Sequence, residues 1–154
     1  DPSMARKLRA LVALILGAGI VLGAIVGVGP ANARWSETPR IGVMGDEVWS
    51  AGSNGCRGSM IASLKNNPAK PGWVQLKVRS RGFTKNDCKV TLRLTFHNTV
   101  APFNHEKYYR VKGTKRSGTL LLDKKVWIGS GFDLIALTST NPAQKGASWY
   151  IAIP

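Results

Sequence analysis

Two histidines and a carboxylate lie close together within residues 97–106. Histidine or glutamate can act as general base and general acid, while nearby Lys or Arg holds a phosphate. His97, His105 and Glu106 are therefore candidate catalytic residues of a metal-independent ribonuclease. Against this, Pro102 and Asn104 mark an exposed loop, where histidines are usually only solvated. A metal site on the same three side chains lacks a further well-spaced ligand, so we expect neither a metal nor a cofactor.

No other motif in the chain points to catalysis. The sequence contains no H-E-x-x-H, no G-x-S-x-G and no glycine-rich phosphate loop that precedes a helix. Asp46 and Glu47 are adjacent, so on a strand their carboxylates point to opposite faces and cannot flank one bond. We therefore expect a binding protein rather than an enzyme.

Basic and aromatic residues alternate in the segment that follows the histidines. Cations of this kind meet phosphates or carboxylates, and aromatic rings stack on bases or sugars. Residues 112–118 are predicted to form a hairpin turn that presents its charges at the tip. The alternative is that the lysines protect an edge strand while Trp127 and one tyrosine fill the core. The predicted ligand-binding residues are Lys107, Tyr108, Arg110, Lys112, Lys115, Arg116, Lys124 and Lys125.

The charge of the chain agrees with an anionic partner. The sequence has 22 Lys and Arg against 8 Asp and Glu, which gives a net charge of +14. A positive field of this size attracts nucleic acid, acidic wall polymers, acidic glycans or an anionic membrane surface. The alternative is that the charge only keeps the protein soluble.

The elements that must position these residues are strands. In residues 88–96, apolar and polar side chains alternate with a period of two, which predicts a half-buried strand. Residues 73–79 repeat the pattern, and turn-forming residues lie between the two segments. If the two strands pair, their outward side chains form a second basic face, made of Lys77, Arg79, Lys89 and Arg93.

The rest of the chain after residue 33 also consists of short strand-like segments separated by Gly, Pro, Asn and Ser clusters. This spacing predicts an all-β fold, a small antiparallel β-sandwich that is immunoglobulin-like only in a generic sense. Trp149 alternates with Ile151 and Ile153 and is expected in the core, whereas Trp35 is expected to be exposed. The further predicted strands are 41–48, 57–64, 108–112, 119–122, 126–128, 134–138 and 148–153.

Cys56 and Cys88 are the two cysteines of the chain. In an oxidising compartment, an isolated pair of this kind forms one disulfide. A zinc site would need a C-x-x-C partner motif, which is absent. True immunoglobulin domains also carry a core Trp between bridged cysteines, and Trp73 has that position here. Their second Cys comes several strands later, however, so the spacing does not support membership of that family.

Residues 4–33 read as a secretory signal peptide. A short basic region precedes the uncharged apolar residues 10–28, and Pro30 and an A-x-A triplet follow them. The alternative is an uncleaved membrane anchor, since the apolar segment approaches the ~20 residues that span a bilayer. We interpret residues 1–3 as an expression scar and 34–154 as a single secreted β-domain. The protein is then secreted or associated with the cell envelope, or membrane-anchored if the segment is retained.

Together these features predict an exported, non-enzymatic protein that binds an anionic polymer or a cell-envelope surface through a basic and aromatic β-sheet surface. One alternative is a secreted ribonuclease that uses His97, His105 and Glu106. Another is a secreted inhibitor or toxin-like protein that presents a loop to a protein partner.

Overall fold

The computed structural model describes residues 34–52, 54–99, 104–141 and 145–154. The predicted signal peptide at residues 4–33, its alternative as an anchor and the expression scar at residues 1–3 lie outside the described residues. Among those that are described, no helix has the length and hydropathy needed to cross a membrane.

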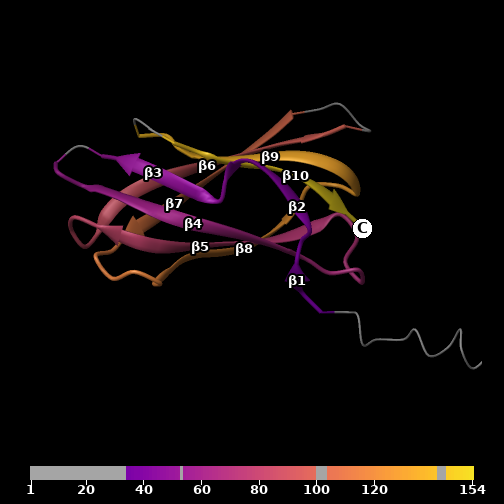
Figure 1. The fold of residues 1–154 in the computed structure, drawn as a ribbon, viewed down its shortest axis with the longest axis horizontal. Coiled ribbons are helices and arrows are strands. Elements are labelled where there is room, and N and C mark those ends of the chain that lie inside the picture. Colours follow the sequence, from indigo (N-terminus) through magenta and orange to yellow (C-terminus); the bar gives the residue numbers. More distant parts are fainter. Residues whose placement is uncertain (1–33, 53, 100–103, 142–144) are drawn as a thin grey trace, which may run out of the picture. The chain divides into compact units, whose positions relative to one another are not determined.

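Two antiparallel sheets make up the structure, so the all-β prediction is confirmed (Figure 1). In sheet A, β4 pairs with β5 on one side and with β1 and β3 on the other, and β8 pairs with β5. In sheet B the order is β2-β10-β9-β6-β7. The strands of sheet A are β1 (Ser36–Glu37), β3 (Glu47–Ala51), β4 (Arg57–Asn66), β5 (Trp73–Phe83) and β8 (Leu120–Trp127). Those of sheet B are β2 (Arg40–Gly45), β6 (Cys88–Asn98), β7 (Asn104–Gly113), β9 (Gly131–Ser139) and β10 (Ala147–Ile153).

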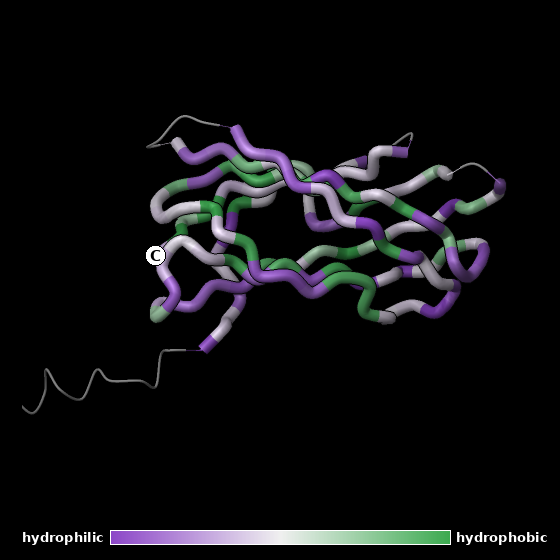
Figure 2. The backbone as a smooth tube through the Cα atoms, turned by 180° about the vertical axis from the view of Figure 1, so that it is seen from behind, coloured by the Kyte–Doolittle hydropathy of each residue, from purple (hydrophilic) through white to green (hydrophobic). Residues whose placement is uncertain are grey.

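The inner faces of both sheets contribute to one hydrophobic core. On β6, Val90, Leu92 and Leu94 are buried while Lys89 and Arg93 are exposed, as the alternation predicts. Figure 2 shows hydrophobic and hydrophilic residues interleaved along the strands of both layers. Trp149, predicted to be in the core, is fully buried on β10, whereas Trp35 is only partly exposed. Burial of these alternate side chains is the main force that holds the sheets together.

Two predictions of how the chain divides into strands are wrong, and the predicted strand 108–112 begins earlier, at Asn104. The predicted strand 41–48 is two strands, β2 in sheet B and β3 in sheet A, which meet at Asp46. Gly45, with a φ of 81°, allows the chain to turn at this corner. Conversely, the predicted strands 119–122 and 126–128 are one strand, β8. Its central charged residues 123–125 are exposed, because β8 is the edge of its sheet and a polar run is tolerated there.

The predicted pairing of the two basic strands is also wrong. β5 lies in sheet A and pairs with β4 and β8, whereas β6 lies in sheet B and pairs with β7 and β9. The connection between them therefore crosses from one layer to the other. Lys77 and Arg79 accordingly lie on sheet A, and Lys89 and Arg93 lie on sheet B, so the four do not form one face.

The Cys56–Cys88 disulfide is confirmed, and it joins the two sheets. Cys56 directly precedes β4 of sheet A, and Cys88 is the first residue of β6 in sheet B. Trp73, between the cysteines in sequence, is 40% exposed, and the fully buried tryptophan is Trp149. The core tryptophan that true immunoglobulin domains place between their cysteines is therefore absent at that position.

Candidate functional site

The β6–β7 hairpin separates the two histidines that the sequence brought together. His97 pairs with Asn104, and the neighbouring residue Phe96 pairs with His105. Consecutive register positions point to opposite faces of a sheet. In agreement with this, Nδ1 of His97 lies 2.8 Å from Oδ1 of Asn104, while the His105 ring stacks on the buried Phe96 with the ring centroids 5.2 Å apart. A hollow of about 290 Å³ borders both histidines, but their rings belong to different faces.

Glu106 does not complete a catalytic group either. It shares the outer face with His97, but its carboxylate accepts a hydrogen bond from the Tyr108 hydroxyl at 2.8 Å. This bond raises the pKa of Tyr108. In the described part of the chain, no three His, Cys, Asp or Glu side chains are grouped closely enough to hold a metal ion. All three candidate residues border the hollow, but His105 belongs to the opposite face of the sheet and the Glu106 carboxylate is bound to Tyr108.

Four cations gather instead on the outer face of sheet B, at the end of the β6–β7 hairpin nearest the disulfide. Lys89 pairs directly with Lys112, and Arg110 and Arg93 follow in the next register positions, opposite Thr91 and Tyr108. We call these four residues, Lys89, Arg93, Arg110 and Lys112, the basic strip. All four are exposed, because Val90, Leu92 and Val111 between them turn inward to the core.

A hollow of about 490 Å³ lies on the basic strip. Lys89, Arg110 and Lys112 line it together with Thr91 and Asn141. The segment that carries Asn141 is held at its border because the backbone N–H of Thr140 donates to the Thr91 carbonyl at 2.9 Å. Three cationic side chains around one concave surface can enclose an anion such as a phosphate or a carboxylate.

The basic strip has no carboxylate partner among the residues that the structure describes. The ion pairs found in the described residues involve other cations, namely Arg40, Lys77, Arg81 and Lys145. Like charges directly opposite each other on neighbouring strands destabilise a sheet. The Lys89–Lys112 pair therefore has an unfavourable electrostatic energy that a bound anion would relieve.

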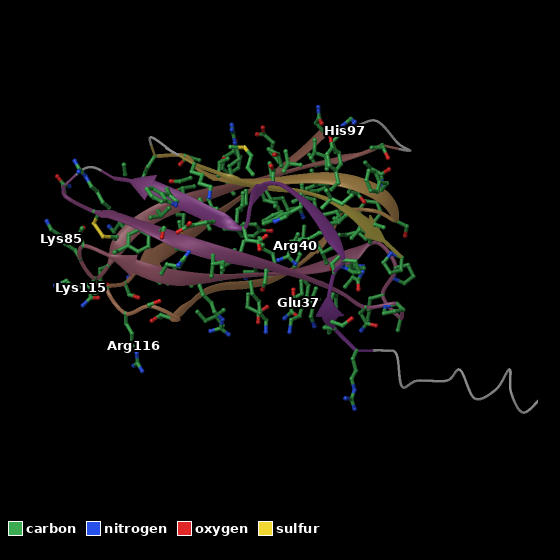
Figure 3. The ribbon with its side chains drawn as sticks, viewed as in Figure 1. Glu37, Arg40, Lys85, His97, Lys115 and Arg116 are labelled. Carbon is green, nitrogen blue, oxygen red and sulfur yellow. A yellow bond between two sulfur atoms is a disulfide. The ribbon has the colours of Figure 1, made fainter. Side chains whose placement is uncertain are left out.

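More positive charge lies at the adjacent end of the sheets, next to the disulfide. Figure 3 shows Lys85, Lys115 and Arg116 at this end. The backbone N–H of Lys115 donates to Oδ1 of Asn86 at 3.0 Å, and the Lys85 ammonium donates to the Asn54 carbonyl at 2.6 Å. Three connections are thereby tied together, and their cations add positive charge at this end of the sheets.

Comparison with known proteins gives no further guide to the site. No family model, curated protein or solved structure matches the chain. The functional argument therefore depends on the residues and their geometry alone.

The predicted ligand-binding segment does not form one surface. Tyr108, Arg110 and Lys112 lie on the outer face of sheet B, while Lys115 and Arg116 lie in the connection to β8. That connection crosses from sheet B to sheet A, so the predicted hairpin at residues 112–118 is wrong. The remaining predicted residues lie elsewhere: Lys107 projects from β7 to the face opposite the strip, and Lys124 and Lys125 lie on β8 of sheet A.

The sequence analysis did not predict that Lys89 and Arg93 share a surface with Arg110 and Lys112, and it did not single out Lys85. A usable signal existed, because Lys89 and Arg93 fall on one face of the first strand and Arg110 and Lys112 fall on one face of the second. Pairing these two segments as a hairpin would have put the four cations on one face. Trp127, for which a core position was one interpretation, is instead 48% exposed.

Proposed function

We propose that this protein is an exported, non-enzymatic binding protein for an anionic polymer or an anionic cell-envelope surface. Its contact surface is the basic strip, extended by Lys85, Lys115 and Arg116. The observation that carries the proposal is the direct cross-strand pair Lys89–Lys112 at a concave surface, with Arg110 beside it and no carboxylate partner among the described residues.

The energetic argument is that the ligand supplies the missing negative charge. A phosphate or carboxylate between two ammonium groups converts a repulsive pair into two charge-assisted hydrogen bonds. Each neutralised polymer charge also releases a condensed counterion, so the affinity falls steeply as salt rises. Tyr108 borders Arg93 and is 56% exposed, which leaves its ring free to stack on a base or a sugar.

Export is the second part of the proposal. The disulfide is typical of a non-reducing compartment, and the sequence of residues 4–33 has the order of a signal peptide. We also propose that the fold is an immunoglobulin-like sandwich in the generic sense of two packed antiparallel sheets. The secreted inhibitor and the secreted ribonuclease are the two alternative functions.

A salt titration with a matched control pair tests the proposed binding surface. The probe is inorganic polyphosphate, and the variant is Lys89→Gln with Lys112→Gln. The control is Lys70→Gln with Lys124→Gln, which removes the same charge from exposed positions outside the basic strip. We expect the strip variant to weaken binding and to lower the slope of log Kd against log salt by about two, one for each lost contact. Equal effects of both variants would show that only net charge matters, and this would refute the proposed surface.

A further inference from the structure

We infer that the outer face of sheet A carries a second binding site, a platform for an acidic glycan built on Trp73 and Trp127. This site is independent of the basic strip, because it lies on the other sheet. Its sugar rings would stack on the two indoles, and its hydroxyl and acid groups would meet a row of polar side chains beside them.

The two tryptophans are direct cross-strand neighbours. Trp73 on β5 pairs with Trp127 on β8, and the next residues along each strand, Val74 and Val126, are buried. Both indoles therefore point outward, where they are 40% and 48% exposed. Because they occupy one register position, the two exposed indoles lie side by side on this face, as a stacking platform requires.

The Trp127 ring is held in place by the neighbouring turn. A Cβ on Gly72 would lie 2.7 Å from Nε1 of Trp127, so the indole lies directly against the glycine backbone. The Gly72 carbonyl accepts hydrogen bonds from the N–H groups of Ile128 and Gly129 at 2.8 and 3.1 Å, which fix this turn to the end of β8. The Trp127 half of the platform is thus preorganised, which lowers the cost of ordering that ring on binding.

The register positions beside the tryptophans carry hydrogen-bonding groups of both kinds. Gln75 pairs with Lys125, and Lys77 pairs with Asp123. Nε2 of Gln75 donates to Oδ1 of Asp123 at 2.8 Å, and Nζ of Lys77 lies 3.6 Å from Oδ2. Donors and acceptors side by side suit the hydroxyl groups of sugars.

The charge around this row favours a glycan that bears acid groups. Lys65 and Lys125 lie on the two strands that flank Gln75, one on each side. Lys125 also lies over the Trp35 ring, with Nζ 5.2 Å from the ring centroid, so a third tryptophan borders the platform. Two ammonium groups beside one sugar site would pair with carboxylates on the chain.

Isothermal titration calorimetry of the full chain can test this inference with two acidic polysaccharides, polygalacturonate and hyaluronate, and with neutral dextran. The variants are Trp73→Ala and Trp127→Ala, with Gln75→Ala for the polar row. The matched control is Trp49→Ala. Trp49 is 45% exposed on the same sheet but pairs with Ser59 of β4, whereas Val74, next to Trp73, pairs with Asn66, about 23 Å along that strand at 3.3 Å per residue. Circular dichroism confirms that each variant is folded.

We expect at least one acidic polysaccharide to bind more tightly than dextran, and each platform variant to weaken that binding about tenfold, as when a stacking aromatic is removed. Trp49→Ala should leave it unchanged. Binding of neither acidic polysaccharide would overturn the inference, as would binding that the tryptophan changes leave intact. If the tryptophan variants lose binding to anionic lipid vesicles while their polysaccharide binding is unchanged, the platform contacts a membrane and the glycan inference is overturned. Polyphosphate binding by the same variants stays at the level of the unaltered protein, so a failure of the basic strip is told apart from a failure of this site.

Discussion

Arg40 and Asp46 contact each other across the corner at which the chain passes from sheet B to sheet A. Nε and Nη2 of Arg40 donate to the two carboxylate oxygens of Asp46 at 3.2 and 3.1 Å. The same carboxylate accepts a hydrogen bond from the indole N–H of the buried Trp149. A bidentate pair of this kind is directional as well as strong, so it fixes the position of β2 relative to β3.

Replacing Asp46 with alanine should destabilise the fold by about 1–3 kcal/mol, because the buried indole N–H of Trp149 loses its acceptor. The exposed Glu37–Arg40 pair offers the control, since Glu37→Ala should cost less than about 1 kcal/mol. Urea unfolding at pH 7 measures both free energies. Equal values for the two variants would contradict a structural role of the Asp46–Trp149 bond.

The Asp46 network should also make the fold acid-sensitive. Burial raises the pKa of Asp46, but the hydrogen bonds from Arg40 and Trp149 outweigh it and leave the pKa below its ordinary value. A lowered pKa contributes stability that is present above the pKa of the unfolded chain and is lost as the pH falls through the folded value. The difference in unfolding free energy between the parent protein and Asp46→Asn should therefore shrink below about pH 4, the ordinary range of this carboxyl. A constant difference would contradict this.

The buried Asp133 should give the free energy of unfolding the opposite pH dependence. Its carboxylate is fully buried on β9, and neither oxygen has a hydrogen-bond partner in the described structure. Burial raises its pKa to about 6, although the charge of His97 acts the other way. The folded state therefore retains its proton where the unfolded chain has lost it, so stability falls as the pH rises from about 4 to about 6.

A two-unit shift corresponds to roughly 2–3 kcal/mol. Urea unfolding of the parent protein and of Asp133→Asn at pH 4.5 and pH 7 isolates the effect, because all other groups are shared. The free energy of the parent should drop relative to the variant at the higher pH. The same pH dependence in both proteins would argue against this role of Asp133.

Charge reversal on the basic strip should separate stability from binding. Lys112→Glu places a carboxylate opposite Lys89 and creates an attractive cross-strand pair, which should stabilise the fold by about 0.2–1 kcal/mol. The same change should weaken polyphosphate binding more than Lys124→Glu does. Thermal unfolding and a binding titration of each variant check the two parts. A less stable Lys112→Glu variant would show that Lys112 has a structural role.

Removing the disulfide should cost about 2–4 kcal/mol in a Cys56→Ala, Cys88→Ala double variant. The unaltered protein in reductant provides the control, since it should unfold at a similar urea concentration. If both remain as stable as the oxidised protein, the bond does not contribute to the stability of the fold.

Local patterns predicted the strands well where one face is buried. The alternation on β6 fixed which of its side chains reach the core, and only its final residues were missed. Pairing is different, because it depends on contacts between distant segments. Nothing in residues 73–96 records that β5 joins β4 and β8 while β6 joins β7 and β9. The sharp corner at Asp46 could not be predicted from the local sequence pattern either. It depends on the conformation of Gly45 and on the hydrogen bonds between Arg40 and Asp46.

The candidate sites follow the same division. Lys112 and Arg110 were predicted to bind because they belong to a segment rich in cations. Their neighbours Lys89 and Arg93 lie on the preceding strand, so that segment does not include them. Proximity in sequence also misled in one case: His97 and His105 flank a single connection, yet strand alternation sends them to opposite faces. The Trp73–Trp127 pair depends on the β5–β8 register and could not be read from composition.

The disulfide also has a mechanical consequence. It joins the residue before β4 to the first residue of β6, at the end of the molecule that carries Lys85 and Lys115. A polymer that pulls on this end under flow would apply its load to both sheets through a covalent bond. The start of β6 would then not separate from the start of β4 while that bond is intact. Under the proposed function, tension on this end would therefore be shared between the two sheets.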